Sequence, residues 1–147
     1  MGIRLRRILL WATAAIGGYL GLWASFWPSA FYASFPGLGR IWIAVDGPFN
    51  EHLIRDVGGL YLGLAAASAA ATFSRSPDAG RVIGVAWAVF GVPHFVYHAG
   101  HFATMAPIDA VGNALTLGGS LILGVVLMVP GPGSDRESRR ATEGARR

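Results

Sequence analysis

The sequence predicts an all-α integral membrane protein, a four-helix bundle whose N and C termini are both cytoplasmic. Three observations support this fold class. Of the 147 residues, 53% are hydrophobic and only 14% are charged, which is less charge than a soluble domain of this size carries. Several apolar stretches approach the length of about 20 residues that a helix needs to cross a bilayer. The arginines fall mostly on one side of a four-span topology.

The first predicted span covers residues 8–27 and follows a short segment with three arginines. A signal peptide also begins this way, but its apolar region is usually about 7–15 residues long and ends at a small-residue cleavage site. This stretch is longer and ends in an aromatic cluster before Pro28, so we expect it to be retained. Gly17 and Gly21 give it a small face for close helix contact.

Residues 29–50 are predicted to lie on the membrane surface as an aromatic lid. Turn signals at residues 36–37 and 46–48 interrupt this segment. Its aromatic side chains suit the interface between water and lipid. Three tryptophans in and near this segment are interpreted as interfacial anchors: Trp23, Trp27 and Trp42.

The second span covers residues 57–73, and the polar sequence NEHLIRD leads into it. Gly59 and Gly63 repeat the four-residue spacing, and alanines dominate the inner half, so close packing against neighbouring helices is expected. The polar connection over residues 74–81 is short, which suits an antiparallel pair of helices.

The third span runs from about residue 82 to 103 and the fourth from 110 to 129. Pro93 should kink the third helix one turn before its histidines, because proline removes a backbone hydrogen bond. The four-span domain is therefore assigned to residues 1–132. Residues 133–147 are charged, lack apolar periodicity and are predicted to form a disordered, basic cytoplasmic tail.

The distribution of arginines predicts the orientation of the helices in the membrane and bears on whether nucleic acid is a partner. Ten of the twelve arginines fall on one side of the four-span topology and two on the other, which places the termini in the cytoplasm. Arginine without lysine, beside much alanine and glycine, indicates a GC-rich bacterial genome and hence the bacterial inner membrane. The basic residues form short separated groups and no helix carries a basic stripe, so nucleic acid is not an expected partner.

Three of the four histidines gather in the segment PHFVYHAGHF, residues 93–102. At about 100° per residue, His94, His98 and His101 fall at roughly 0°, 40° and −20° around a helix, so they share one narrow face. An ionisable side chain is costly inside a bilayer and marks a functional site there. We therefore predict a site in the outer half of the bundle.

The second and fourth helices are expected to bring further polar side chains to the same depths, among them Asp109 and Asn113 of the fourth. His94 and His101 are separated by about 10.5 Å of helical rise, too far for both to bind one ion. Adjacent pairs, either His94 with His98 or His98 with His101, can chelate. Side chains at the start of the second helix could complete the shell. The candidate metal ligands are His94, His98, His101, His52, Asp56 and Glu51.

The available ligand types limit which metals the site could bind. The chain contains no cysteine, so a metal would take nitrogen and oxygen ligands, as zinc, iron, copper and manganese do. The pattern HxxxHxxH lacks the glutamate of the zinc-protease signature and implies no hydrolytic mechanism. Simpler interpretations remain open: the histidines could bind lipid headgroups, and Arg55 could pair with Glu51 one turn away. Tyr61 and Tyr97 could donate hydrogen bonds inside the site.

The overall pattern of four short spans, an aromatic first loop and an acidic start to the second helix resembles small bacterial membrane proteins of the DoxX-like kind. This resemblance covers roughly residues 8–130. The region from FYASFPG to NEHLIRD is also similar to a group of uncharacterised bacterial membrane proteins. Neither resemblance implies an activity, and neither transfers a functional residue.

Three functions are compatible with these features. The first is a transition-metal site that performs redox or Lewis-acid chemistry on a small or lipid-soluble substrate such as a quinone. The second is b-type haem binding for electron transfer, with a third-helix histidine and His52 as axial ligands. The third is an accessory or transport role in which a polar pocket responds to protons or metals without chemistry. The sequence leaves open whether the protein is an enzyme.

Overall fold

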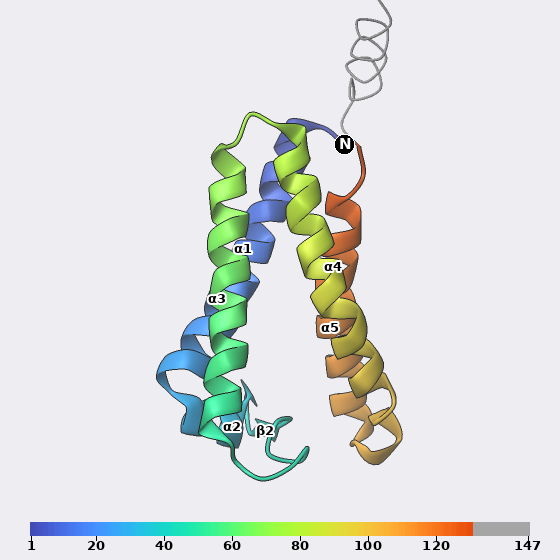
Figure 1. Ribbon diagram of the computed structural model, residues 1–147. Coiled ribbons are helices and arrows are strands. Elements are labelled where there is room, and N and C mark those ends of the chain that lie inside the picture. The colour runs from blue at the N-terminus through green and yellow to red at the C-terminus, as the bar shows by residue number, and fades with distance from the viewer. Residues whose placement is uncertain (131–147) are drawn as a thin grey trace, which may run out of the picture.

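The computed structural model describes residues 1–130, and this part of the chain is mostly helical (Figure 1). Four long helices are present: α1 (Ile3–Phe26), α3 (Glu51–Phe73), α4 (Pro77–Ala99) and α5 (Pro107–Leu127). Each contains a stretch that is long and apolar enough to cross a membrane. The prediction of four long apolar helices is thereby confirmed. The predicted tail, residues 133–147, lies outside the described residues.

Short elements connect α1 to α3. They are α2 (Pro28–Ser34), β1 (Pro36–Gly37) and β2 (Arg40–Ile41). The two strands pair antiparallel, with Pro36 opposite Ile41. Leu38 and Gly39 between them both have positive φ angles, 57° and 75°, as a two-residue hairpin turn of the primed type requires. The hairpin holds the next residue, Trp42, whose backbone N–H donates to the carbonyl of Phe35 at 2.8 Å.

The long helices form two antiparallel pairs, α1 with α3 and α4 with α5 (Figure 1). Glycines bring the backbones of each pair close together. A Cβ atom on Gly21 would lie 2.8 Å from the backbone nitrogen of Leu62, and one on Gly84 would lie 2.6 Å from the carbonyl oxygen of Gly124. Gly17 likewise packs against Tyr61, which confirms the small face predicted for the first helix.

The close packing expected of α3 is present, since Ala65 lies against Gly17, but Gly59 and Gly63 take no part in it. Gly59 and Gly63 are exposed, and a Cβ atom on either would meet no atom within 4 Å. The helix turns Gly58 toward α1 instead, and Gly58 is buried against Ser25. Because each residue rotates the side chain by about 100°, the neighbouring glycine points outward. Four-residue spacing identified a small face but not its direction.

The two pairs meet at the end of the molecule that holds the N terminus. A buried cluster spans all four helices there: Leu10, Tyr61, Leu64, Ile83, Trp87 and Leu127. The Trp87 indole N–H donates to the Ser68 hydroxyl at 3.0 Å. The Met1 ammonium donates to the carbonyl of Pro130 at 2.6 Å, just beyond the carboxyl end of α5, where a helix attracts positive charge. The N terminus and the end of α5 therefore lie together.

Local signals set where the helices begin and end. The Asn50 side chain caps α3 by accepting from the backbone of Leu53 at 3.1 Å, as expected of an N-cap asparagine. The predicted third helix was too long at its carboxyl end, because α4 stops at Ala99 and Gly100 begins a turn. A 3₁₀ turn, η1 (Phe102–Thr104), then leads to α5. The helix itself continues through Pro93.

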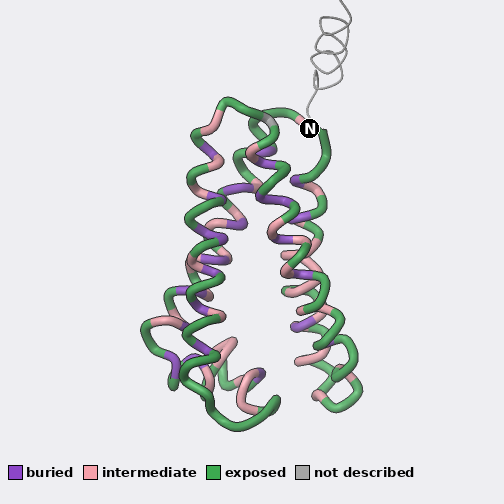
Figure 2. Tube along the Cα trace, viewed as in Figure 1, coloured by how far each residue is buried: buried purple, intermediate pink, exposed green. Residues whose placement is uncertain are grey.

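The outward faces of the long helices are apolar. Figure 2 shows exposed residues along the outside of both helix pairs. They include many large hydrophobic side chains, such as Ile8, Phe73, Val82, Val89 and Ile122. A water-soluble monomer rarely exposes so continuous an apolar surface. An apolar outer surface is expected of helices that cross a membrane.

Candidate functional site

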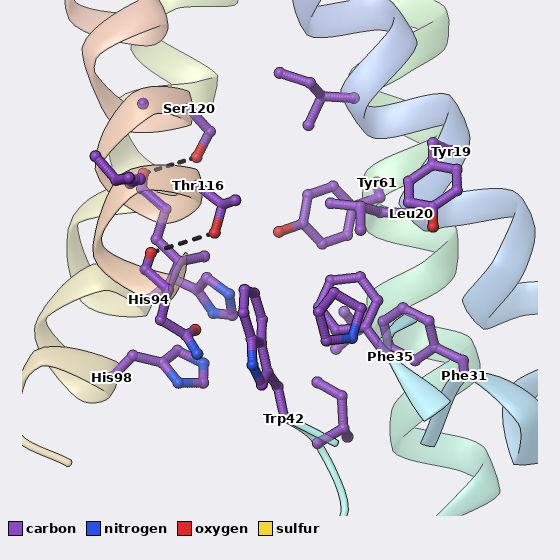
Figure 3. Close-up of a pocket in the computed structure, with 18 of the residues that line it drawn as sticks. Tyr19, Leu20, Phe31, Phe35, Trp42, Tyr61, His94, His98, Thr116 and Ser120 are labelled. Atoms are coloured by element: carbon purple, nitrogen blue, oxygen red, sulfur yellow. Dashed lines mark hydrogen bonds between the residues drawn. The ribbon is translucent and has the colours of Figure 1, made fainter. Parts of the chain in front are cut away.

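A cavity of about 650 Å³ lies between the two helix pairs, at the end away from the N terminus. All four long helices line it, together with α2 and the hairpin segment (Figure 3). Its size falls within the usual range of small-molecule sites, roughly 300–1,000 Å³. Most of its lining side chains are aliphatic or aromatic. The cavity is therefore large enough to hold a small-molecule ligand.

One wall of the cavity is aromatic. Phe31 and Phe35 pack with ring centroids 4.8 Å apart, and Phe35 meets Trp42 edge to face at 5.8 Å. Such pairs stabilise one another beyond their buried area. Phe31 and Trp42 are buried, so these rings are fixed by packing. The wall offers flat apolar faces to a ligand.

Trp42 also fastens the loop to α5. Its indole N–H donates to Asp109 Oδ1 at 2.8 Å, and Arg40 pairs with Asp109 Oδ2 at 3.3 Å. Gly112, one turn along α5, leaves room for the ring, because a Cβ atom there would lie 2.7 Å from Trp42 Cζ2. The predicted lid thus crosses from one helix pair to the other at the end of the cavity.

Two of the predicted histidines line the cavity, and they come from α4. Residue His94 is stacked on Phe90 with centroids 5.1 Å apart. His98 meets His94 edge to face at 4.9 Å and is buried. Within residues 1–130, neither imidazole ring hydrogen-bonds to a protein group. Their nitrogen atoms are therefore available to a ligand in the cavity.

Tyr61 supplies a third polar group from α3. Its ring is buried against Phe90, edge to face at 5.1 Å. Figure 3 shows the hydroxyl pointing into the cavity, toward the side occupied by α4 and α5. Among the described residues, no protein atom accepts a hydrogen bond from this hydroxyl. A phenol that keeps its donor free in a mostly apolar cavity is suited to bind a ligand oxygen.

Hydroxyl and amide groups of α5 line the remaining wall. The Thr116 hydroxyl donates to the Gly112 carbonyl at 2.9 Å, and the Ser120 hydroxyl donates to the Leu117 carbonyl at 2.8 Å (Figure 3). Because their protons are used within the helix, these oxygens can still accept. The buried Asn113 lies one turn before Thr116 on the same face.

The other predicted ligands lie outside the cavity. His101 follows α4 in the turn, is exposed, and its Nδ1 lies 2.7 Å from the Tyr97 carbonyl oxygen. The His52 ring contacts Asp56 at 3.2 Å, and both side chains are exposed. Glu51 pairs with Arg55 at 2.8 Å, the structural contact that the sequence suggested.

The structure therefore places two of the six predicted ligands in the cavity, His94 and His98. Across residues 1–130, no three histidine or acidic side chains group closely enough to hold a metal ion. The pair could supply two nitrogen ligands. The remaining ligands of a metal would then come from a bound molecule or water.

Several lining residues were not anticipated from the sequence. Three aromatic residues expected at the membrane surface form the aromatic wall of the cavity instead. They are Phe31, Phe35 and Trp42. The signal for Thr116 and Ser120 was present: with Asn113 they place polar groups on one face of an otherwise apolar helix. The aromatic residues gave no comparable signal, because α2 and the hairpin together turn them inward.

Comparison of the chain with protein-family models, with curated proteins and with solved structures finds no match. The functional evidence therefore comes from the cavity and its lining groups. The resemblance to DoxX-like proteins stays a prediction.

Proposed function

We propose that this protein is a multi-pass membrane protein whose cavity binds a lipid-soluble molecule with an uncharged, hydrogen-bonding head group, a class that includes quinones. The apolar outer surface and the four long apolar helices support the membrane location. The bias of arginines favours cytoplasmic termini, and Met1 and Pro130 lie at one end of the bundle. The cavity would then lie in the outer half of the bilayer.

The observation that carries the proposal is a set of three polar groups without protein partners in an apolar cavity. They are the imidazoles of His94 and His98 and the hydroxyl of Tyr61. In apolar surroundings a polar group costs free energy unless it is hydrogen-bonded, so a ligand that bonds to these groups is stabilised in the cavity. A ligand carbonyl could accept from an imidazole N–H or from the phenol. The flat rings of the aromatic wall suit a planar head group.

Binding can be tested on the purified protein in lipid nanodiscs, using a methoxylated benzoquinone that carries a decyl chain as the probe. Equilibrium binding should be saturable, and Tyr61→Phe or His94→Ala should weaken it by roughly fivefold or more, since one hydrogen bond to a ligand is worth about 1 kcal/mol or more. His52→Ala is the matched control, because His52 is exposed and lies outside the cavity. Equal affinities in all three variants would count against the proposal.

A second candidate is a transition metal held by His94 and His98. Their rings lie edge to face with centroids 4.9 Å apart, and the two residues are one helical turn apart. This function would be tested by metal analysis and an absorption spectrum of the purified protein beside His98→Ala. A stoichiometric metal, or a Soret band from haem, that disappears in the variant would favour this candidate. Unchanged content in both proteins would reject it.

A further inference from the structure

The cavity is open to the outside on one side. Among the residues that line it, only Tyr19, Leu115 and Thr116 are exposed, and all others are buried or half-buried. Tyr19 belongs to α1 and is 56% exposed, whereas Leu115 belongs to α5 and is 70% exposed. The opening therefore lies between α1 and α5, one helix from each pair.

Specific contacts join the elements on the other sides of the cavity. Between α3 and α4, Tyr61 packs on Phe90 at 5.1 Å and on Trp87 at 6.2 Å. At the end away from the N terminus, the Trp42 indole bonds to Asp109. At the other end, the buried cluster joins the two helix pairs. A molecule in the cavity can therefore extend outward between α1 and α5 without displacing any of these contacts.

The three polar groups without protein partners and the opening belong to different helices. His94 and His98 come from α4 and Tyr61 comes from α3, whereas the opening lies between α1 and α5. The side chains of Ile16, Leu20 and Leu123 near α1 and α5 are aliphatic. A head group held by the histidines thus leaves the rest of the ligand facing an apolar exit.

We propose that the ligand is a head-and-tail molecule whose long apolar tail leaves the cavity between α1 and α5 and lies in the bilayer. This inference rests on the proposed function, because it assumes that the head group binds in the cavity. A compact ligand without a tail would need no exit. A ligand with a tail enters sideways from the membrane, where its concentration is highest.

Gly119 offers a place to block the exit. It lines the cavity on α5, and a Cβ atom there would meet no atom within 4 Å. Gly119→Phe therefore adds a ring on the cavity side with little change to the packing around the new Cβ atom. Gly63→Phe is the matched control, because Gly63 on α3 is equally open but is exposed and outside the cavity.

The experiment compares two probes in nanodiscs, the benzoquinone ring with a decyl chain and the same ring without a tail, with affinities expressed per lipid-phase concentration. Gly119→Phe should weaken binding of the decyl probe by about tenfold or more and leave the tail-free probe within about twofold, whereas Gly63→Phe should change neither. A decyl probe with a photoreactive group at the end of its tail should label α1 and α5 in the parent protein.

Other outcomes separate the two proposals. If both probes bind and Gly119→Phe weakens them equally or not at all, the tail exit is wrong while the binding function stands. Labelling of α3 and α4 in place of α1 and α5 would overturn the exit in the same way. If neither probe binds the parent protein, the proposed quinone-like ligand is wrong and the tail inference falls with it.

Discussion

The contact between Gly112 and Trp42 gives a sharp test of how the loop closes the cavity. In Gly112→Ala the new Cβ atom would lie 2.7 Å from Trp42 Cζ2 and 2.9 Å from Cη2. Carbon atoms in good contact are about 3.5–4.0 Å apart, so the indole must move by most of an ångström. Trp42 is buried and its N–H bonds to Asp109, and neither the packing nor the bond leaves it free to move.

The expected loss of stability follows from two opposing effects. Alanine in place of glycine in a helix stabilises by roughly 0.5–1 kcal/mol. Overpacking of a filled site costs roughly 1–3 kcal/mol. Gly119→Ala experiences only the first effect, because its Cβ atom meets nothing within 4 Å. The difference between the two variants therefore isolates the clash, and Gly112→Ala should be less stable by about 1–3 kcal/mol.

The assay is reversible unfolding in mixed micelles, followed by helix content. A second background, Trp42→Phe, removes the two ring atoms that clash. In that background, Gly112→Ala should lose its penalty relative to Gly119→Ala, which a double-mutant cycle would report as a coupling energy. If the two alanine variants are equally stable in the parent protein, Trp42 does not occupy the position described and the account of closure is refuted.

Three further predictions use the same unfolding assay. Ser68→Ala removes the acceptor of the buried Trp87 N–H and should lower the free energy of unfolding by about 1–3 kcal/mol; an unchanged value would mean the bond is not formed. Asp109→Ala should lower the free energy of unfolding more than Asp109→Asn does, because the amide oxygen of asparagine can still accept a hydrogen bond from Trp42. Equal losses in the two variants would show that only the charge of Asp109 matters. Gly21→Ala should destabilise by roughly 1–3 kcal/mol, since its Cβ atom would lie 2.8 Å from the backbone of α3; a neutral result would place the α1–α3 crossing elsewhere.

Much of the fold could be predicted because length and composition determine it. Four stretches of apolar residues separated by polar turns predict four long helices, and the structure has them. Gly17 and Gly21 correctly indicated a close helix contact. Gly59 and Gly63 did not, because spacing alone cannot tell which face of a helix meets its neighbour. The end of α4 was missed because the apolar sequence continues past Gly100 into the turn.

The candidate site was only partly predictable. Helical periodicity correctly placed His94 and His98 on one face, since they lie one turn apart within a regular helix. His101 follows the last helical residue, Ala99, so the same periodicity no longer applies to it. His52 was expected at the same depth, but depth does not determine direction around a helix, and its ring is exposed beside Asp56.

The role of Trp42 could not be predicted from its neighbours. Its position depends on a hairpin turn, on the bond to Asp109 and on space left by Gly112, residues that are far apart in the sequence. Such non-local contacts carry no short-range sequence signal. The cavity itself has the same origin, because it arises where the two helix pairs separate and the loop fills only the end.

The most direct test of the central claim is nuclear magnetic resonance of the imidazole nitrogens in histidine-labelled protein, recorded in nanodiscs with and without the decyl benzoquinone. The chain has four histidines, and single substitutions assign them. The ring signals of His94 and His98 should shift on binding, while those of His52 and His101 should stay in place. Shifts confined to His52 and His101, or no shifts at saturating probe, would contradict the central claim.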